Sequence, residues 1–189
     1  MSGAAVSPRP VVRRLARAGD AEIAALAELL VDVVEGGASV GFMQPIDLAR
    51  AEAFWRGVAA GVARGERALF VAEDGEPGAI VGTVQLVVQQ PENQPHRADV
   101  AKMLVRRGAR RRGIGAALMK AAEDEARGLD KTLLVLDTAS ADAERLYARL
   151  GWQRCGVIPD YALWPDGGLC ATTVFYKYLS VAPPVAVAV

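Results

Sequence analysis

The segment from Met103 to Ala116, MLVRRGARRRGIGA, constrains the fold more than any other, because an apolar strand pattern passes through a turn rich in Arg and Gly into a helical pattern. The first backbone N–H groups of a helix have no partner within it, and the helix dipole favours negative charge there. Gly113 and Gly115 place no Cβ between this backbone and a ligand. Positive charge beside them comes from Arg110, Arg111 and Arg112. The segment therefore predicts an anion site between a strand and a helix.

Two common phosphate motifs do not fit this segment. A nucleotide P-loop needs Lys and then Ser or Thr after its last Gly, whereas Ile114 and Gly115 follow Gly113. A dinucleotide fingerprint that starts at Gly113 needs a small residue where Leu118 stands. The pattern that remains, Arg110-x-x-Gly113-x-Gly115, predicts phosphate contacts from backbone amides and arginine.

Apolar periodicity predicts a mixed α/β fold. A helical period predicts helices at 20–35, 47–63, 113–127 and 142–150, with Asp20 and Asp47 as N-terminal caps. Extended patterns predict strands at 11–17, 68–73, 79–89, 97–105, 132–138, 153–158 and 171–178, and the turn DGEPG joins the second strand to the third. A length of 189 residues suits one domain, which we place at 11–180 between flexible ends at 1–10 and 181–189.

Composition narrows the functional classes. With 52% hydrophobic and 23% charged residues the chain is globular, and its 22 basic and 22 acidic side chains cancel, which argues against a surface built for nucleic acid. No apolar run approaches the roughly 18 residues of a membrane span, and the N-terminus lacks the apolar core of a signal peptide. Cys155, Cys170 and His96 are too few for a disulfide framework or a zinc site. We therefore expect a cytoplasmic protein without metal, membrane or nucleic-acid partner.

A second segment gives the first its meaning. The predicted helix and turn from Ala143 to Trp152, AERLYARLGW, follow the Gly-rich turn along the chain. Together the two segments resemble the signatures of the GNAT acetyltransferase superfamily, and the resemblance extends from about Val11 to Tyr178. It implies a mixed, mostly antiparallel sheet of about seven strands flanked by about four helices. The departures are Arg107, Arg111 and Ser140, where the family often has Pro, Gly and Asn.

The resemblance implies that acetyl-CoA binds along the first segment. Backbone N–H groups at the end of the preceding strand would polarise the thioester carbonyl, and Tyr147 would be the general acid for the CoA sulfur or would simply pack on CoA. The residues implied to contact acetyl-CoA are Met103, Leu104, Val105, Arg110, Arg111, Arg112, Gly113, Ile114, Gly115, Ala116 and Tyr147.

Two carboxylates are candidates for the base that accepts a proton from an amine. Asp137 ends an apolar strand, and the strand period of two places Asp99 on one face with Met103 and Val105. If the two strands are neighbours, the acids flank one cleft and bind a cationic amine. The alternatives are that Asp137 caps the next segment and that Asp99 pairs with Arg97 or Lys102.

The acceptor side shows a narrower resemblance. The segments GGASVGFM, RADVAKMLV and LDT are similar to those of the tabtoxin-resistance members of the superfamily, which acetylate a β-lactam dipeptide. This implies a small-molecule amine, such as a toxin or antibiotic, as substrate. The residues expected to contact it are Ser39, Val40, Phe42, Asp99, Asp137 and Tyr161, the last in the turn-rich segment PDYALWPDGG.

Other functions remain open at this point. Acetylation of protein or peptide amines would need an open groove, and an acyl-CoA sensor would bind acetyl-CoA without turnover. Nucleic-acid binding through RRGARRR would lack stacking aromatics. The chain is expected to be a monomer or a homodimer.

Overall fold

The computed structural model describes residues 10–74 and 78–179. The flexible ends predicted at 1–10 and 181–189 lie outside these residues except for Pro10, and so does the centre of the turn DGEPG. Chain order is β1 (Val11–Leu15), α1 (Asp20–Glu35), α2 (Leu48–Ala63), β2 (Arg67–Glu73), β3 (Ile80–Val87), β4 (Arg97–Val105), the 3₁₀ turn η1 (Arg107–Ala109), α3 (Ile114–Gly128), β5 (Leu133–Thr138), α4 (Ala141–Arg149), β6 (Gln153–Leu163) and β7 (Leu169–Tyr178).

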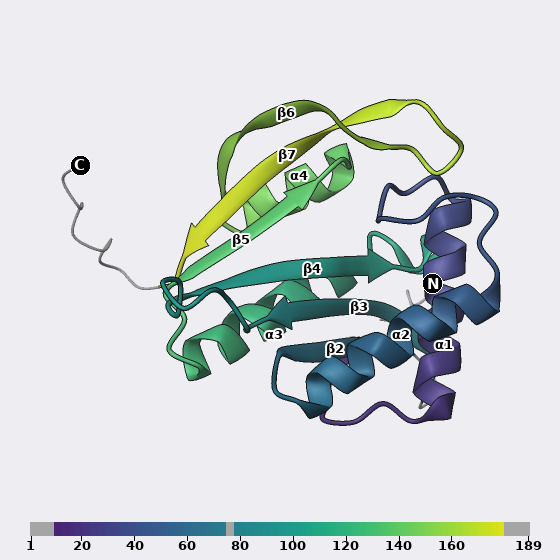
Figure 1. Ribbon diagram of the computed structural model, residues 1–189, viewed down its shortest axis with the longest axis horizontal. Helices are drawn as coiled ribbons and strands as arrows, with labels where there is room; N and C mark the ends of the chain where they lie inside the picture. Colours follow the sequence, from purple (N-terminus) through teal and green to yellow (C-terminus); the bar gives the residue numbers. More distant parts are fainter. Residues whose placement is uncertain (1–9, 75–77, 180–189) are drawn as a thin grey trace, which may run out of the picture.

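The strands form one seven-stranded sheet in the order β1-β2-β3-β4-β5-β7-β6 (Figure 1). Only β4 and β5 pair in parallel, and every other neighbouring pair is antiparallel. This confirms the mixed, mostly antiparallel sheet that was expected. The described residues form the predicted order of strands and helices with small shifts at their ends.

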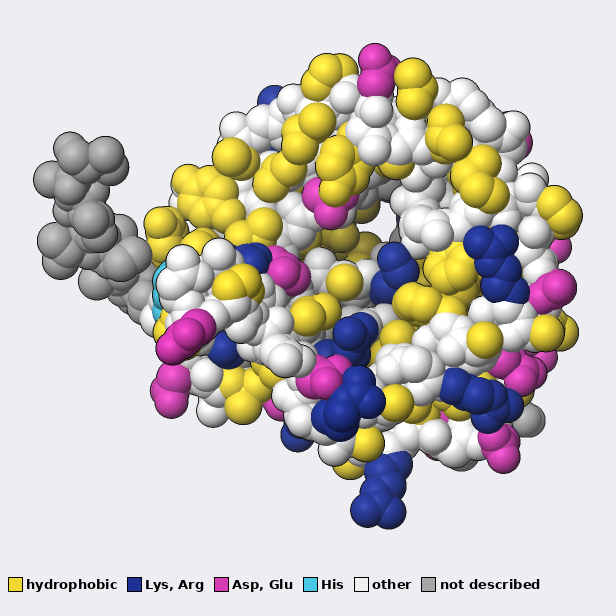
Figure 2. Space-filling view, in the orientation of Figure 1, with side chains coloured by type: hydrophobic (Ala, Val, Ile, Leu, Met, Phe, Trp, Pro, Cys, Tyr) yellow, Lys and Arg dark blue, Asp and Glu magenta, His cyan; other side chains and the backbone are white. Residues whose placement is uncertain are grey.

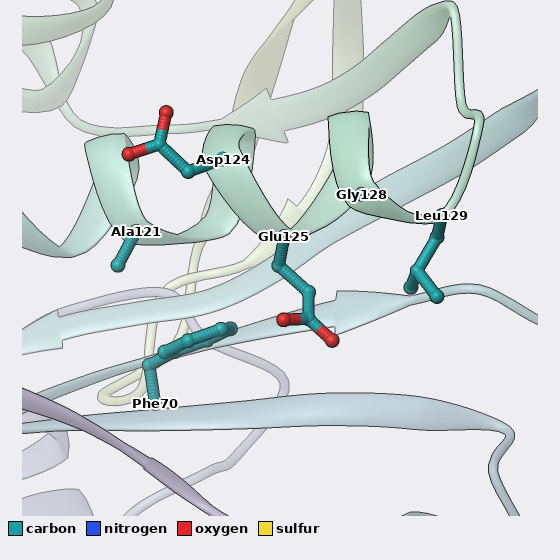
Figure 3. Close-up of a pocket in the computed structure, with 6 residues that line it drawn as sticks. All are labelled: Phe70, Ala121, Asp124, Glu125, Gly128 and Leu129. Carbon is teal, nitrogen blue, oxygen red and sulfur yellow. The ribbon is translucent and has the colours of Figure 1, made fainter.

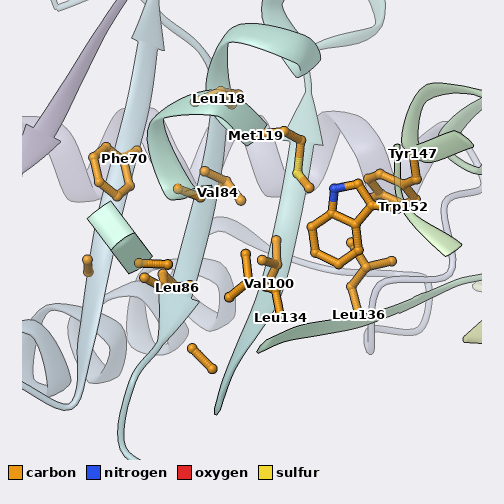
Figure 4. Packing of buried hydrophobic residues seen from close by; sticks show 14 of the residues in the cluster. Phe70, Val84, Leu86, Val100, Leu118, Met119, Leu134, Leu136, Tyr147 and Trp152 are labelled. Atoms are coloured by element: carbon orange, nitrogen blue, oxygen red, sulfur yellow. The ribbon is translucent and has the colours of Figure 1, made fainter. Parts of the chain in front are cut away.

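Alternation along the strands builds a core on each face of the sheet. Residues such as Phe70, Val84 and Leu134 point to α3 and α4, whose apolar stripe is buried against them (Figure 4). The intervening residues, such as Leu69 and Val71, point to α1 and α2. Each helical layer therefore covers one face of the same sheet.

Two local expectations need correction. Helix α1 is capped at Gly19, not Asp20, because the carboxylate of Glu22 accepts the backbone N–H of Gly19 at 3.0 Å. Asp47 does cap α2 and accepts the N–H of Arg50 at 2.7 Å. The last hairpin is longer than predicted, because register shifts carry pairing of β6 past Ile158 to Leu163.

A bulge in β4 decides which side chains face which layer. Between Ala101 and Leu104 this strand has one residue more than β3, and Lys102 takes the left-handed backbone conformation with φ 50°. Such a conformation costs about 1–3 kcal/mol outside glycine. The extra residue reverses the alternation, so that Met103 and Val105 pack toward α3 while Asp99 does not. The prediction that Asp99 shares a face with Met103 and Val105 is therefore wrong.

Candidate active site

The two central strands separate from each other beyond a short paired stretch. β4 and β5 are in register only over Arg97–Asp99 and Leu133–Val135. From Ala101 onward, the edge of β4 that faces β5 has no strand partner, so its backbone groups are available to a ligand. Figure 2 shows the molecule hollowed at this place, between β4 and the β6–β7 hairpin. We call this space, between the diverging ends of β4 and β5, the cleft.

The Gly-rich turn carries a row of unpaired donors at the same end of β4. The backbone N–H groups of residues 111–116 have no acceptor within the described residues, and no side chain caps α3. Gly113 adopts φ 81°, a conformation that glycine takes without strain, and thereby turns the chain into the helix. Several convergent N–H groups at a helix start suit a phosphate or pyrophosphate.

The arginines of this turn differ in what they contact. Arg112 forms an ion pair with Asp74 at the end of β2, and Arg110 donates to the carbonyl of Val105 at 3.4 Å. Arg111 has φ 62° and makes no hydrogen bond or ion pair within the described part of the chain. Within the described residues, Arg110 and Arg111 therefore have no ion-pair partner, and their charges are available to an anion.

Arg107, at a position where the family often has proline, uses two N–H groups to bind Asp32. Its backbone N–H donates to Asp32 on α1 at 2.9 Å, and its Nε donates to the same carboxylate at 3.0 Å. Proline offers neither donor. Burial opposes ionisation of Asp32, but the hydrogen bonds and charge of Arg107 outweigh it, so that the pKa of Asp32 lies below its ordinary value. This pair anchors the start of the Gly-rich turn to α1.

Tyr147 lies between α4 and the sheet. Its ring is buried beside Trp152 (Figure 4), with the centroids 6.0 Å apart, and beside Phe175, whose centroid is 5.8 Å away. Its hydroxyl forms no hydrogen bond within the described residues and is not among the fully buried polar atoms. Burial raises the pKa of Tyr147, and the negative charge of Asp137 raises it further. The phenol therefore stays protonated at neutral pH, as a proton donor must.

A buried ion pair holds the surroundings of Tyr147. Glu123 on α3 accepts from Trp152 Nε1 at 3.0 Å and from Lys177 Nζ at 2.8 and 2.7 Å. Lys177 also donates to the carbonyl of Leu150 at 2.7 Å. The network thus joins α3, β7 and the end of α4.

The two acidic candidates share a face of the sheet but differ in how much of each carboxylate is free. Asp99 pairs with Val135 across the parallel register, which places it on the same face as Asp137. Both oxygens of Asp99 are engaged, one by Arg97 and the other by Gln90 at 3.0 Å. Among the described residues, Asp137 accepts one hydrogen bond, from Thr172 at 2.8 Å, and the residue is exposed. Asp137 is therefore the freer acceptor.

The predicted acceptor loop lies under the tip of the last hairpin. Ser39 donates to the carbonyl of Leu163 at 3.0 Å, and the backbone N–H of Gln44 donates to the carbonyl of Pro165 at 2.8 Å. Figure 1 shows the tip of the β6–β7 hairpin and the α1–α2 loop side by side, beyond the ends of β4 and β5. Val40 and Phe42 pack against the core under α1 and α2, and Tyr161 is 56% exposed on β6.

Lys102 was not among the predicted site residues, although it stands beside them. Its Nζ lies 5.8 Å from the ring centroid of Phe54, and a Cβ on Gly41 would come within 3.5 Å of it. Sequence reasoning considered it only as a partner of Asp99, which pairs with Arg97 instead. The available signal was a lysine inside an apolar strand, where a charge needs a reason.

A second depression lies away from this cleft. It is a shallow hollow of about 440 Å³ between α3 and β2, lined by Phe70, Ala121, Asp124, Glu125, Gly128 and Leu129 (Figure 3). Glu125 there pairs with Arg14 at 3.1 Å. None of the motif residues borders it, so we place no chemistry there.

The residues at the cleft fit acetyl-CoA. Unpaired amides and Arg111 match a pyrophosphate, the open edge of β4 can hydrogen-bond an extended amide-bearing chain, and Tyr147 stands where the strands diverge. Residues 28–152 match the profile of the acetyltransferase (GNAT) family. The chain belongs to that family. It is an acetyl-CoA-dependent acetyltransferase.

Individual proteins support the assignment. An uncharacterized N-acetyltransferase of the hisH-hisA intergenic region of Azospirillum brasilense is 31% identical over 152 residues, covering 71% of this chain and 83% of that protein. A phosphinothricin acetyltransferase from Sinorhizobium meliloti, solved with acetyl-CoA, superposes with a TM-score of 0.75 at 18% identity and 95% coverage of both chains. The yncA acetyltransferase of Salmonella typhimurium, also with acetyl-CoA, gives 0.73 at 20% identity, covering 95% of this chain and all of the other.

These likenesses do not bear on the tabtoxin-resistance resemblance, which stays a prediction. Among the described residues, no helix is long and apolar enough to cross a membrane.

Proposed function

We propose that this GNAT protein transfers the acetyl group of acetyl-CoA to a primary amine of a small molecule, by direct attack while both substrates are bound. The observation that carries the proposal is that Tyr147 lies within the electrostatic influence of Asp137, and the unpaired amides of residues 111–116 support it. Acetyl-CoA supplies an activated acetyl group. The chain supplies binding, orientation and the two proton transfers.

The first proton transfer prepares the acceptor. An alkylamine with a pKa near 10.4 is almost entirely protonated at neutral pH and cannot attack a carbonyl in that form. Asp137 attracts the ammonium, and its free oxygen accepts the proton directly or through one water. Asp99 is engaged by Arg97 and Gln90, and the guanidinium balances its charge, so the role of base is left to Asp137.

The second transfer concerns the departing sulfur. Tyr147 keeps its proton because burial raises its pKa, and it donates that proton to the thiolate. A thiol has a pKa near 8.5, so the thiolate leaves readily and this donation modulates the rate without deciding whether reaction occurs. Backbone N–H groups of Met103 and Val105 would polarise the thioester carbonyl beforehand, whereas the N–H of Leu104 points to β3, as the N–H of Arg106 does.

The covered cleft supports a small acceptor. The hairpin tip is hydrogen-bonded to the α1–α2 loop through Ser39 and Gln44. A polypeptide segment would need an open groove in which to lie, whereas a small amine needs only an opening of its own width. A toxin or antibiotic amine, of the kind that the tabtoxin-resistance resemblance implies, satisfies this requirement.

Calorimetric titration with acetyl-CoA, followed by thiol release across a panel of small amines, amino acids, β-lactam dipeptides and peptide N-termini, tests the proposal. Asp137→Asn and Tyr147→Phe should retain acetyl-CoA binding, with transfer greatly reduced in the first and slowed in the second. Lys120→Met changes an exposed lysine on α3 and serves as the control.

Three results would contradict the proposal. Binding of acetyl-CoA without release by any amine would favour a sensor. Acetylation confined to peptide termini would favour protein substrates. Full activity of Asp137→Asn would remove the base from its assigned role.

A further inference from the structure

Lys102 occupies the wall of the cleft without a partner. It is half-buried at the β4 bulge and makes no hydrogen bond or ion pair within residues 10–74 and 78–179. Burial lowers its pKa, while the charge of Asp137 counteracts this effect. A partly desolvated ammonium is costly unless an anion or dipole compensates it. Its position therefore calls for a negative group that the chain itself does not bring into contact.

Other groups make the same side of the cleft cationic. Phe42 and Phe54 stack edge to face with centroids 5.2 Å apart, Lys102 lies over Phe54, and the guanidinium of Arg50 lies 5.7 Å from the centroid of Phe42. An aromatic face attracts a cation but accepts no strong hydrogen bond. The two rings therefore provide no hydrogen-bond acceptor for Lys102 or Arg50. Arg50 also has no ion-pair partner among the described side chains.

The opposite wall is anionic. Asp137 stands on β5, across the divergence from Lys102 on β4, and the two charges influence each other without forming an ion pair. Figure 2 shows a basic side chain directly below the hollow and an acidic one to its left. The cleft thus presents a carboxylate and an ammonium on facing walls.

We infer that the acceptor is an amine that carries an anionic group a few bonds from its nitrogen, and that Lys102 binds this group while Asp137 receives the amine. Amino acids and amine-bearing phosphonates or phosphinates belong to this class. The inference rests on the proposed function and specifies the acceptor class of the same cleft. It assigns Lys102 to substrate specificity and leaves proton transfer to Asp137 and Tyr147.

The division of roles makes Lys102 testable apart from the chemistry. A charge-assisted contact to substrate contributes about 1.5–3 kcal/mol, which corresponds to roughly a 10- to 150-fold effect on kcat/KM. A neutral amine makes no such contact and should be indifferent to the substitution. The loss should appear mainly in KM, because the anionic group does not react.

The experiment compares matched acceptors with and without the anion. Amino acids, their carboxamides and their aminophosphonate analogues are assayed by thiol release, with rates corrected to the unprotonated fraction of each amine. The variants are Lys102→Met, Lys102→Arg and the control Lys120→Met. Acetyl-CoA affinity, measured by calorimetry, and the unfolding midpoint report whether each variant retains its fold and its cofactor site.

We expect the parent to prefer the anionic acceptors over the carboxamides by about tenfold or more. Lys102→Met should lower kcat/KM for anionic acceptors by about 10- to 100-fold, change that for carboxamides less than threefold, and leave acetyl-CoA affinity unchanged. Lys102→Arg should keep part of the preference, and Lys120→Met all of it. A larger effect on carboxylates or on phosphonates would tell which anion the cleft takes.

Two outcomes would overturn the inference while the proposed function stands: transfer to carboxamides as efficient as to the acids in the parent, or an equal loss for both classes in Lys102→Met. Should Lys102→Met not fold, the parent's preference and Lys102→Arg still decide. If the parent transfers acetyl to no acceptor of either class, the proposed function itself fails, and the inference with it.

Discussion

Replacing Lys177 with methionine tests the network that supports Tyr147. The substitution removes an ammonium that makes contacts of 2.8 and 2.7 Å with the carboxylate of Glu123 and 2.7 Å with the carbonyl of Leu150. Glu123, only 6% exposed, would retain Trp152 at 3.0 Å and Arg127 at 3.5 Å. Methionine fills a similar volume, so the main effect is electrostatic.

Breaking a buried ion pair by removing one partner costs about 3–5 kcal/mol, because the other charge is left uncompensated. Arg127 still contacts Glu123, but its side chain is 45% exposed and its charge is screened by water. We therefore expect a loss near the lower limit, about 3 kcal/mol, which lowers Tm by about 6–12 °C in a domain of this size. Urea unfolding at constant slope measures the free energy, and a thermal scan measures Tm.

A second substitution identifies the cause. Glu123→Gln in the Lys177→Met background removes the stranded charge while the amide oxygen still accepts from Trp152, so the double variant should be more stable than Lys177→Met alone. Lys120→Met removes an exposed pair with Asp124 and should change the free energy by less than about 0.5 kcal/mol. A shift below about 2 °C in Lys177→Met, or a double variant less stable than the single, would refute the electrostatic reasoning.

Three further substitutions test other parts of the molecule. Tyr147→Phe should lower kcat by about 10- to 100-fold in a thiol-release assay. Above about pH 10 the unfolded state loses a phenol proton that the folded state keeps, so the stability of the parent should fall with rising pH in this range. The stability of the variant should fall less. Asp32→Asn should abolish a stability contribution that the parent has above about pH 4 and loses as pH falls, since its folded pKa is lowered; urea midpoints from pH 2 to 6 measure it. Gly82→Ala should destabilise by about 1–3 kcal/mol and weaken acetyl-CoA binding, because the new Cβ would lie 2.9 Å from Ile114 in the first turn of α3, whereas Gly57→Ala, with open space around it, should be neutral or stabilising.

The order of elements could be predicted because its signals are local, and so could the uncapped, Gly-rich start of α3. Glycines at a helix start, an Arg-rich turn and apolar periodicity all lie within a few residues of the structure that they determine. The same holds for Asp47, whose side chain caps the helix that follows directly. The cap at Gly19 was missed because glycine has no side chain that could signal it. Its N–H is bound by the carboxylate of Glu22, whereas Asp20 is a residue type that commonly caps helices.

We call the lining of the cleft around Asp99, Lys102 and Asp137 the acceptor wall. This wall could not be predicted in the same way as the order of elements. Its arrangement depends on one extra residue in β4, and a bulge leaves no mark in the periodicity of so short a strand. The partners of Asp99 and Ser39 are likewise set by tertiary contacts, with Gln90 across a turn and with Leu163 far along the chain. Lys102 lies within the bulge, so the alternation of side chains along a regular strand does not predict which face of the sheet it occupies.

The bulge also separates two tasks within a single strand. Before Lys102, the residues Asp99 and Ala101 of β4 belong to the acceptor wall. After it, Met103 and Val105 face α3. Substitutions at Asp99 or Ala101 can therefore change which amine is accepted with little effect on how α3 packs, and substitutions at Met103 can change that packing with little effect on the acceptor wall. In related proteins with the same bulge, the preference for one amine over another can therefore change during evolution while α3 keeps its packing against the sheet.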